Sequence, residues 1–174
     1  PQVFIYSGFD SNGSTFLALK KLLVEKNIPV IKLSAGDKIK IGEAYFLVLW
    51  PPKNKEIKDL NDASLILRLI DGKHSILFSG DASSKILDNL INIRAEILKV
   101  SHHGSKTATD ENILQLVNPS IALIGVGLNN SFHHPNDEVI NLLKQFGVKI
   151  FRTDLNGTIK IILANQILIK SINN

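Results

Sequence analysis

Four of the five histidines of this chain fall in two short segments, and a carboxylate ends a third. His102 and His103 follow the apolar run EILKV, and Asp81 follows ILFSG. His133 and His134 come in the segment after the run IALIGVG. Imidazole nitrogens and carboxylate oxygens bind zinc, manganese and iron, and the chain has no cysteine to supply sulfur. These residue types therefore indicate a divalent metal site built from nitrogen and oxygen ligands.

The same side chains each lie just past the carboxyl end of a predicted strand, where sites recur in layered α/β sheets. Taken singly, each has another explanation. Asp81 could cap a helix that begins near Ser83, and an imidazole of the pair at 102–103 could bond a loop carbonyl. His134 could pack in a turn before Pro135. The convergence of three strand-end loops favours the metal site over these separate explanations.

The residues after the histidine pair indicate a second kind of chemistry. Gly104 allows the backbone a close approach to a ligand, and hydroxyl groups and one ammonium group follow it. The residues that could form an anion cradle here are Ser105, Lys106, Thr107 and Thr109. The alternative is a helix start, with Thr109 as the N-cap and with Asp110 and Glu111 favourable to the helix dipole. Both interpretations can hold at once.

Hydrophobic periodicity predicts the elements that must position these groups. Strands are expected at 2–7, 29–34, 38–41, 44–50, 64–70, 74–81, 95–101, 120–127 and 148–153, with two more after them, and helices at 14–27, 83–92, 110–117 and 136–147. The apolar run at 44–50 is typical of a strand buried on both faces. Ser14 is the expected N-cap of the first helix, and His74, beside the Asp71–Gly72 turn, is expected to be solvated. Strands with helices outside them predict a layered α/β domain.

Composition sets limits on the class of protein. The 174 residues, 44% hydrophobic and 21% charged, suffice for one globular domain, and no apolar run is long enough for a membrane span. The net charge of +4 slightly favours a polyanionic partner, but the lysines are scattered, as on an ordinary solvated surface. Because the chain begins with Pro1 and contains no methionine, we expect that it was cut from a longer protein.

Five segments carry a resemblance to a known family. They are NDASLILRL at 61–69, ILFSGD at 76–81, LKVSHHGSKT at 98–107, VGLNNSFHHPNDEVI at 126–140 and FRTDLNGTIKI at 151–161. In order and spacing they resemble the metallo-β-lactamase-type domain of the ComEC competence family, from about Lys38 to about Ile161. The resemblance implies an α/β (α+β) fold, an αββα sandwich of mixed sheets flanked by helices, here as the later part of one domain over residues 1–174.

The resemblance also implies a function. The domain would be a metal-dependent nuclease that acts on DNA during uptake, with two divalent ions (zinc, manganese or iron) and no nucleotide cofactor. DNA is the expected partner, together with a membrane channel in the same parent protein. The implied location is bacterial, in a soluble domain on the extracytoplasmic side of the cytoplasmic membrane. A soluble cytoplasmic protein is the alternative.

Residue roles follow from the same resemblance. Asp81 and His134 match metal ligands, His103 is a further ligand or a catalytic group, and His102 is catalytic. The residues assigned to the substrate phosphate are Ser105, Lys106 and Thr107. The residues assigned supporting roles are Asn61, Ser64, Gly104 and His133, the last of which stands where the family usually has glycine. Which imidazole has which role stays open.

One departure from the family is large. Hydrolases of this fold carry a His-x-His-x-Asp-His motif in their first half, and this chain has none. The expectation is an N-terminally truncated domain that is inactive alone, while the complete domain is a hydrolase. Two other functions stay open: hydrolysis of a small ester, lactone or phosphodiester, and non-catalytic binding of DNA or of a partner protein.

Overall fold

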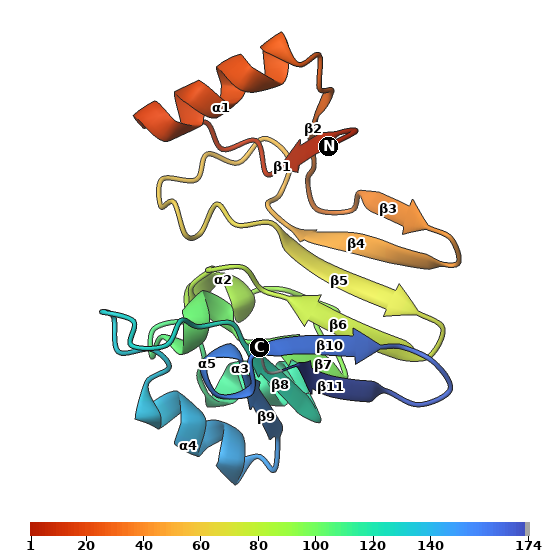
Figure 1. The fold of residues 1–174 in the computed structure, drawn as a ribbon, viewed down its shortest axis with the longest axis vertical. Coiled ribbons are helices and arrows are strands. Elements are labelled where there is room, and N and C mark those ends of the chain that lie inside the picture. Colours follow the sequence, from red (N-terminus) through yellow and green to blue (C-terminus); the bar gives the residue numbers. More distant parts are fainter. Residues whose placement is uncertain (173–174) are drawn as a thin grey trace.

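The structure, a computed structural model, describes residues 1–172 (Figure 1). The last two residues of the predicted domain, 173–174, lie outside the described residues. The elements in chain order are β1 (Phe4–Tyr6), α1 (Ser14–Glu25), β2 (Val30–Lys32), β3 (Lys38–Ile41), β4 (Ala44–Trp50), β5 (Ile66–Asp71), β6 (His74–Phe78), α2 (Ser84–Leu87), β7 (Ile97–Lys99), α3 (Glu111–Val117), β8 (Ile121–Ile124), α4 (Asp137–Gln145), β9 (Lys149–Arg152), α5 (Thr153–Asn156), β10 (Thr158–Ile162) and β11 (Leu168–Ile172).

The central feature is a seven-stranded sheet in the order β3-β4-β5-β6-β7-β8-β9. Strands β3 to β6 pair antiparallel, and β6 to β9 pair parallel. The predicted hairpin at 64–81 is confirmed, with Asp71 paired to His74 across the turn. Helices α2, α3 and α4 occur in the crossovers between the parallel strands, so the expected mixed sheet flanked by helices is confirmed.

The core lies between the parallel strands and these helices. Its most deeply buried side chains include Leu77 on β6, Leu98 on β7, Ile124 on β8 and Leu143 on α4, each 1% exposed or less. Burying a leucine or isoleucine side chain contributes about 1.5–3 kcal/mol. The ends of the parallel strands, and the loops that leave them, are therefore held by a well-packed scaffold.

The first part of the chain is more open. Strands β1 and β2 form a separate parallel pair, and in α1 only Leu23 is buried among the described residues. In β4, only Val48 and Trp50 are buried within the described range, so the expectation of burial on both faces is wrong. The reason is position: β4 pairs with β3, the edge strand, while the helices of the core cover the parallel half of the sheet.

Three expectations about helices need correction. Gly13, not Ser14, is the N-cap of α1. Within the described chain, no side chain caps the free backbone amides in the first turn of this helix. Asp110, not Thr109, caps α3, because its carboxylate accepts a hydrogen bond from the Ile113 amide at 3.0 Å. Helix α2 ends at Leu87 instead of continuing to residue 92, and the Asn89 side chain that follows donates to the Lys85 carbonyl at 2.7 Å in place of a backbone donor. Among the described residues, no helix combines the length and apolar character that a membrane crossing requires.

Candidate functional site

The loops after β6, β7 and β8 meet at one edge of the sheet, as the sequence predicts. The His102 ring lies 5.9 Å from the His134 ring and 6.4 Å from the His103 ring, centroid to centroid. The Nε2 atom of His103 lies 3.8 Å from Oδ1 of Asp81. We call these four residues, Asp81, His102, His103 and His134, the histidine rim. Three separate strand ends thus bring one carboxylate and three imidazoles together.

The loop that carries the histidine pair has a strained backbone. Ser101–Gly104 form a 3-10 turn in which His102 (φ 46°) and His103 (φ 56°) both adopt left-handed conformations. Such a conformation costs roughly 1–2 kcal/mol for a residue with a side chain. The His102 amide donates to the Gly80 carbonyl at 3.1 Å, and the amide of residue 105 donates to the His102 carbonyl at 2.9 Å. These bonds hold both imidazoles at the rim despite the strain.

Gly104 provides the close approach expected of it. Its φ is 85°, and a Cβ atom built there would lie 2.5 Å from Cβ of Pro135. The Asn136 amide also donates to the Gly104 carbonyl at 3.0 Å. The histidine-pair loop is therefore packed directly against the loop that carries His134, and a side chain at position 104 would separate the two.

His103 has the protonation pattern of a metal-binding imidazole. Its Nδ1 atom is hydrogen-bonded to the Gly125 carbonyl, which can only accept, so Nδ1 carries the hydrogen. In the neutral ring the lone pair is then on Nε2, the atom that faces Asp81. Metal-bound histidines commonly donate their other N–H to a carbonyl in this way. Two ligands of a tetrahedral ion, each about 2.1 Å from it, lie roughly 3.4 Å apart, close to the separation seen here.

His134 is held by a residue to which the sequence analysis gave no role. The Asn130 side chain accepts a hydrogen bond from the His134 amide at 3.0 Å and donates to its carbonyl at 2.7 Å. Burial, followed by the nearby charges of His102 and His103, lowers the pKa of His134. Its Nδ1 atom is buried and has no hydrogen-bond partner in the described part of the chain. A neutral imidazole with an uncommitted nitrogen is the form that binds metal. The neighbouring His133 is exposed, and its amide donates to the Asn130 carbonyl at 3.2 Å.

Asp81 has a second partner that the sequence analysis missed. The Lys99 ammonium lies 3.7 Å from Oδ1 of Asp81 and donates to the Gly80 carbonyl at 2.9 Å. Burial lowers the pKa of Lys99, although Asp81 opposes that effect. A lysine at the end of the apolar strand ILK was the available signal. The Lys99 ammonium therefore partly neutralises the Asp81 carboxylate, as a bound metal ion would do.

The Asn61–Ser64 turn supports the aspartate loop. The Ser64 hydroxyl accepts a hydrogen bond from the Asp81 amide at 3.0 Å, and the Ser64 amide donates to the Asn61 carbonyl at 3.0 Å. A Cβ atom at Gly80 would lie 2.6 Å from Cβ of Ser64. Ser64 thus contacts the aspartate loop through its hydroxyl, whereas Asn61 contributes only its backbone carbonyl, and the supporting role of both residues stays a prediction.

The predicted phosphate-binding residues lie beside the rim. Ser105 is 7% exposed, and its hydroxyl shares a 3.1 Å hydrogen bond with the hydroxyl of Thr107. The Lys106 amide donates to the Asn136 side chain at 3.0 Å, while Lys106 and Thr107 as whole residues are exposed. Of the three, Lys106 is the one with a free cation facing solvent.

The segment Arg152–Asp154, at the carboxyl end of β9, lies beside the loop that follows β8. The Arg152 guanidinium donates two hydrogen bonds to the Asp154 carboxylate, at 3.1 and 2.6 Å. This pairing raises the pKa of Arg152 and lowers the pKa of Asp154. The Thr153 hydroxyl bonds both the amide and the carbonyl of Val126 at 2.7 Å. The segment Arg152–Asp154 therefore fixes the start of the loop that leads to His134.

The rim fits part of a metal site. The His103 tautomer and the uncommitted His134 nitrogen match what metal ligands require. Within residues 1–172, however, no three His, Asp or Glu side chains are grouped closely enough to hold an ion. The Lys99 ammonium also stands beside Asp81. The rim thus has side chains with the chemistry of metal ligands, but the described residues do not form a complete metal site.

His74 lies far from the rim and contradicts the expectation of a solvated side chain. It is 6% exposed, at the start of β6, and bonds the Glu96 carboxylate at 2.7 Å and the Ala164 carbonyl at 2.8 Å. The expectation failed because both partners are distant in sequence and one is a backbone carbonyl.

Comparison with solved structures defines the class of the fold. The chain is similar to CmlA, a diiron β-hydroxylase from Streptomyces venezuelae, with a TM-score of 0.55 and 11% identity over 86% of this chain and 38% of that one. A point variant of the same hydroxylase gives a TM-score of 0.52 with 12% identity over the same shares. With the mixed sheet and its flanking helices, these neighbours define a metallo-β-lactamase fold. No protein-family model matches the chain.

The chain is also similar in sequence to parts of longer bacterial proteins, among them a competence protein. The chain is 34% identical to ComE operon protein 3 of Bacillus subtilis over 82% of its length, and 33% identical to competence protein ComA of Neisseria gonorrhoeae over 66%. It is 32% identical to recombination protein 2 of Haemophilus influenzae over 63%. These bacterial relatives support a competence family of the ComEC type. The matched region spans 19%, 17% and 14% of the three relatives, respectively.

Proposed function

We propose that this chain forms part of a metal-dependent hydrolase domain that cleaves DNA phosphodiester bonds during competence DNA uptake. The observation that carries the proposal is the convergence of the histidine rim at one sheet edge, in a chain similar to competence proteins. A partner DNA and a membrane channel within the same bacterial parent protein belong to the proposal. So does an extracytoplasmic location of the domain.

The roles of the rim residues follow from their surroundings. A bound divalent ion of zinc, manganese or iron would supply a nucleophilic hydroxide and stabilise charge on the phosphodiester. Asp81, His103 through Nε2, and His134 would contribute ligands to the proposed pair of ions. His102, whose ring lies 5.9 Å from the His134 ring, would contact a phosphate oxygen of the substrate.

Positive charge near the rim suits a DNA substrate. The Lys106 side chain would contact the phosphate backbone, with Ser105 and Thr107 ordering its loop. Lys99 would hold the Asp81 carboxylate in place through its 3.7 Å ion pair. Backbone contacts of this kind carry no sequence information, so cleavage should show little preference for DNA sequence.

The test is a cleavage assay on the full-length protein with added manganese or zinc. Single-stranded and double-stranded DNA would be compared with a generic phosphodiester and a lactone. We expect metal-dependent DNA cleavage that Asp81→Asn reduces by roughly 100-fold or more, because a ligand is lost. Asp71→Asn, an aspartate at the opposite end of the adjoining hairpin, is the matched control and should leave the rate unchanged. Lactone turnover without DNA cleavage would overturn the proposal in favour of a small-ester hydrolase, and binding without any turnover would favour a non-catalytic module.

A further inference from the structure

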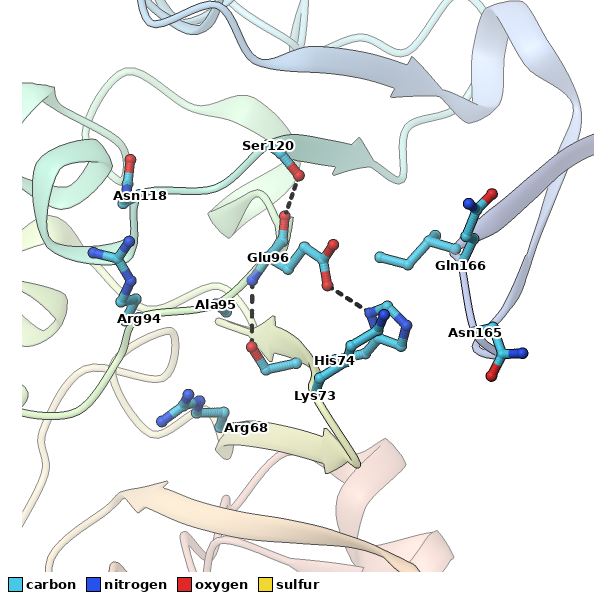
Figure 2. A pocket seen from close by; sticks show the side chains of 12 residues that line it. Arg68, Lys73, His74, Arg94, Ala95, Glu96, Asn118, Ser120, Asn165 and Gln166 are labelled. Atoms are coloured by element: carbon cyan, nitrogen blue, oxygen red, sulfur yellow. Dashed lines mark hydrogen bonds and ion pairs between the residues drawn. The ribbon is translucent and has the colours of Figure 1, made fainter.

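A polar cavity lies at the opposite end of the parallel strands from the histidine rim. Its volume is about 740 Å³, within the size range of small-molecule sites. The walls come from the starts of β6, β7 and β8 and from the turn between β10 and β11 (Figure 2). This is the amino end of the parallel strands, where layered α/β sheets seldom bind ligands, so the cavity is not explained by the fold class.

Three cations line this cavity. Within residues 1–172, the side chains of Lys73 and Arg94 make no hydrogen bond or ion pair, and both residues are exposed. Arg68 donates from Nη1 to the Asn92 carbonyl at 3.1 Å, which leaves its charge unneutralised. Figure 2 shows Arg68 and Arg94 on one side of Glu96 and Lys73 beside His74 on the other. The cations therefore approach the cavity from separate elements.

The acidic residue of the cavity is already neutralised. Glu96 is the one carboxylate that lines it among the described residues. Both partners of His74, the Glu96 carboxylate and the Ala164 carbonyl, can only accept hydrogen bonds, so both ring nitrogens must donate. That requires an imidazolium, whose charge cancels the charge of Glu96. The lining therefore keeps a net positive charge, which is carried by Arg68, Lys73 and Arg94.

We infer that this cavity binds a phosphate group, carried either by a nucleotide or by the backbone of a DNA strand. Guanidinium and ammonium groups are the usual partners of phosphate, and an opening with excess positive charge attracts anions from solution. The amides of Asn118 and Gln166 add neutral donors and acceptors beside the cations, as a sugar or base would require. The inference does not depend on catalysis at the rim.

The test is a binding titration of the wild-type protein with inorganic phosphate, deoxyadenosine monophosphate and a short single-stranded oligodeoxynucleotide. The Lys73→Ala/Arg94→Ala double variant should weaken binding of the preferred probe by roughly tenfold or more, because charged hydrogen bonds are lost. The control is Lys40→Ala/Lys144→Ala, which removes the same charge from two exposed lysines outside the cavity and should change affinity less than about twofold.

The probes separate the sources of the phosphate. Tightest binding of the oligonucleotide, with an affinity that falls steeply with salt, supports the DNA backbone. Tightest binding of the mononucleotide supports a free nucleotide. If the wild-type protein binds none of the three probes, or if both double variants lose affinity equally, the cavity is not a phosphate site.

Discussion

The two ends of the parallel strands use charge and backbone in opposite ways. At the carboxyl end, the rim residues His102 and His103 lie on a strained backbone, and Nε2 of His103 faces the Asp81 carboxylate. At the amino end, His74 is buried as half of a closed ion pair, and the free charges belong to exposed cations. The comparison shows that both ring nitrogens of His74 are bonded within the protein, whereas His103 and His134 at the rim each keep a ring nitrogen without a hydrogen bond in the described residues.

The largest effect should come from breaking the contact that joins the rim loops. Gly104→Ala adds a Cβ atom 2.5 Å from Pro135 in a left-handed conformation, so we expect a loss of about 2–4 kcal/mol in the free energy of unfolding. Urea denaturation would measure it. Gly36→Ala is the control, since Gly36 has a similar φ of 97° and no described atom within 4 Å of an added Cβ atom. Equal losses at both positions would mean that the contact with Pro135 is unimportant.

A smaller effect, dependent on pH, should appear at the other end. The hydrogen bond to Glu96 raises the pKa of His74 in the folded protein, so the stabilisation is complete below the unfolded value of 6.5 and is lost as pH rises through the folded value. The difference in melting temperature between wild type and His74→Gln should therefore be larger at about pH 5.5 than at about pH 9. A difference that grows with pH would contradict the ion pair.

The smallest effect on stability should come from the rim itself. His102→Gly removes a side chain from a residue with φ 46°, and the relief of strain should roughly offset the entropy cost of glycine. We expect the free energy of unfolding to stay within about 1 kcal/mol of wild type, measured by urea denaturation, while metal-dependent activity of the full-length protein falls. A loss as large as that of Gly104→Ala would give His102 a structural role instead.

The rim was predictable from sequence because strand ends are local features. Asp81, His103 and His134 each follow an apolar run, and parallel strands align their ends without further information. The residues that hold these side chains in place were harder to predict from the sequence. Asn130, which holds His134, resembles any loop asparagine, and Lys99 resembles the other scattered lysines until its strand is known to be buried.

The cavity at the amino end could not be predicted, because it is formed by residues that are distant in sequence. His74 meets Glu96 and Ala164 only after the hairpin of β10 and β11 packs against the start of β6, and contacts across such separations leave no local pattern. The N-cap of α3 shows that sequence patterns also leave the exact start of a helix undecided. Thr109 and Asp110 are adjacent candidates, and only backbone geometry selects Asp110.

The central claim, that the histidine rim binds divalent metal, is tested most directly by NMR of the imidazole groups with paramagnetic manganese. Because the rim is an incomplete ligand set, binding by this chain should be weak and substoichiometric, which paramagnetic broadening still detects. At about pH 7.5, where free imidazoles are neutral, the signals of His102, His103 and His134 should broaden at low manganese concentrations, and Asp81→Ala should prevent it. His74, at the other end of the strands, is the internal control and should stay sharp. Equal broadening of all the histidines, or broadening that survives Asp81→Ala, would contradict the account.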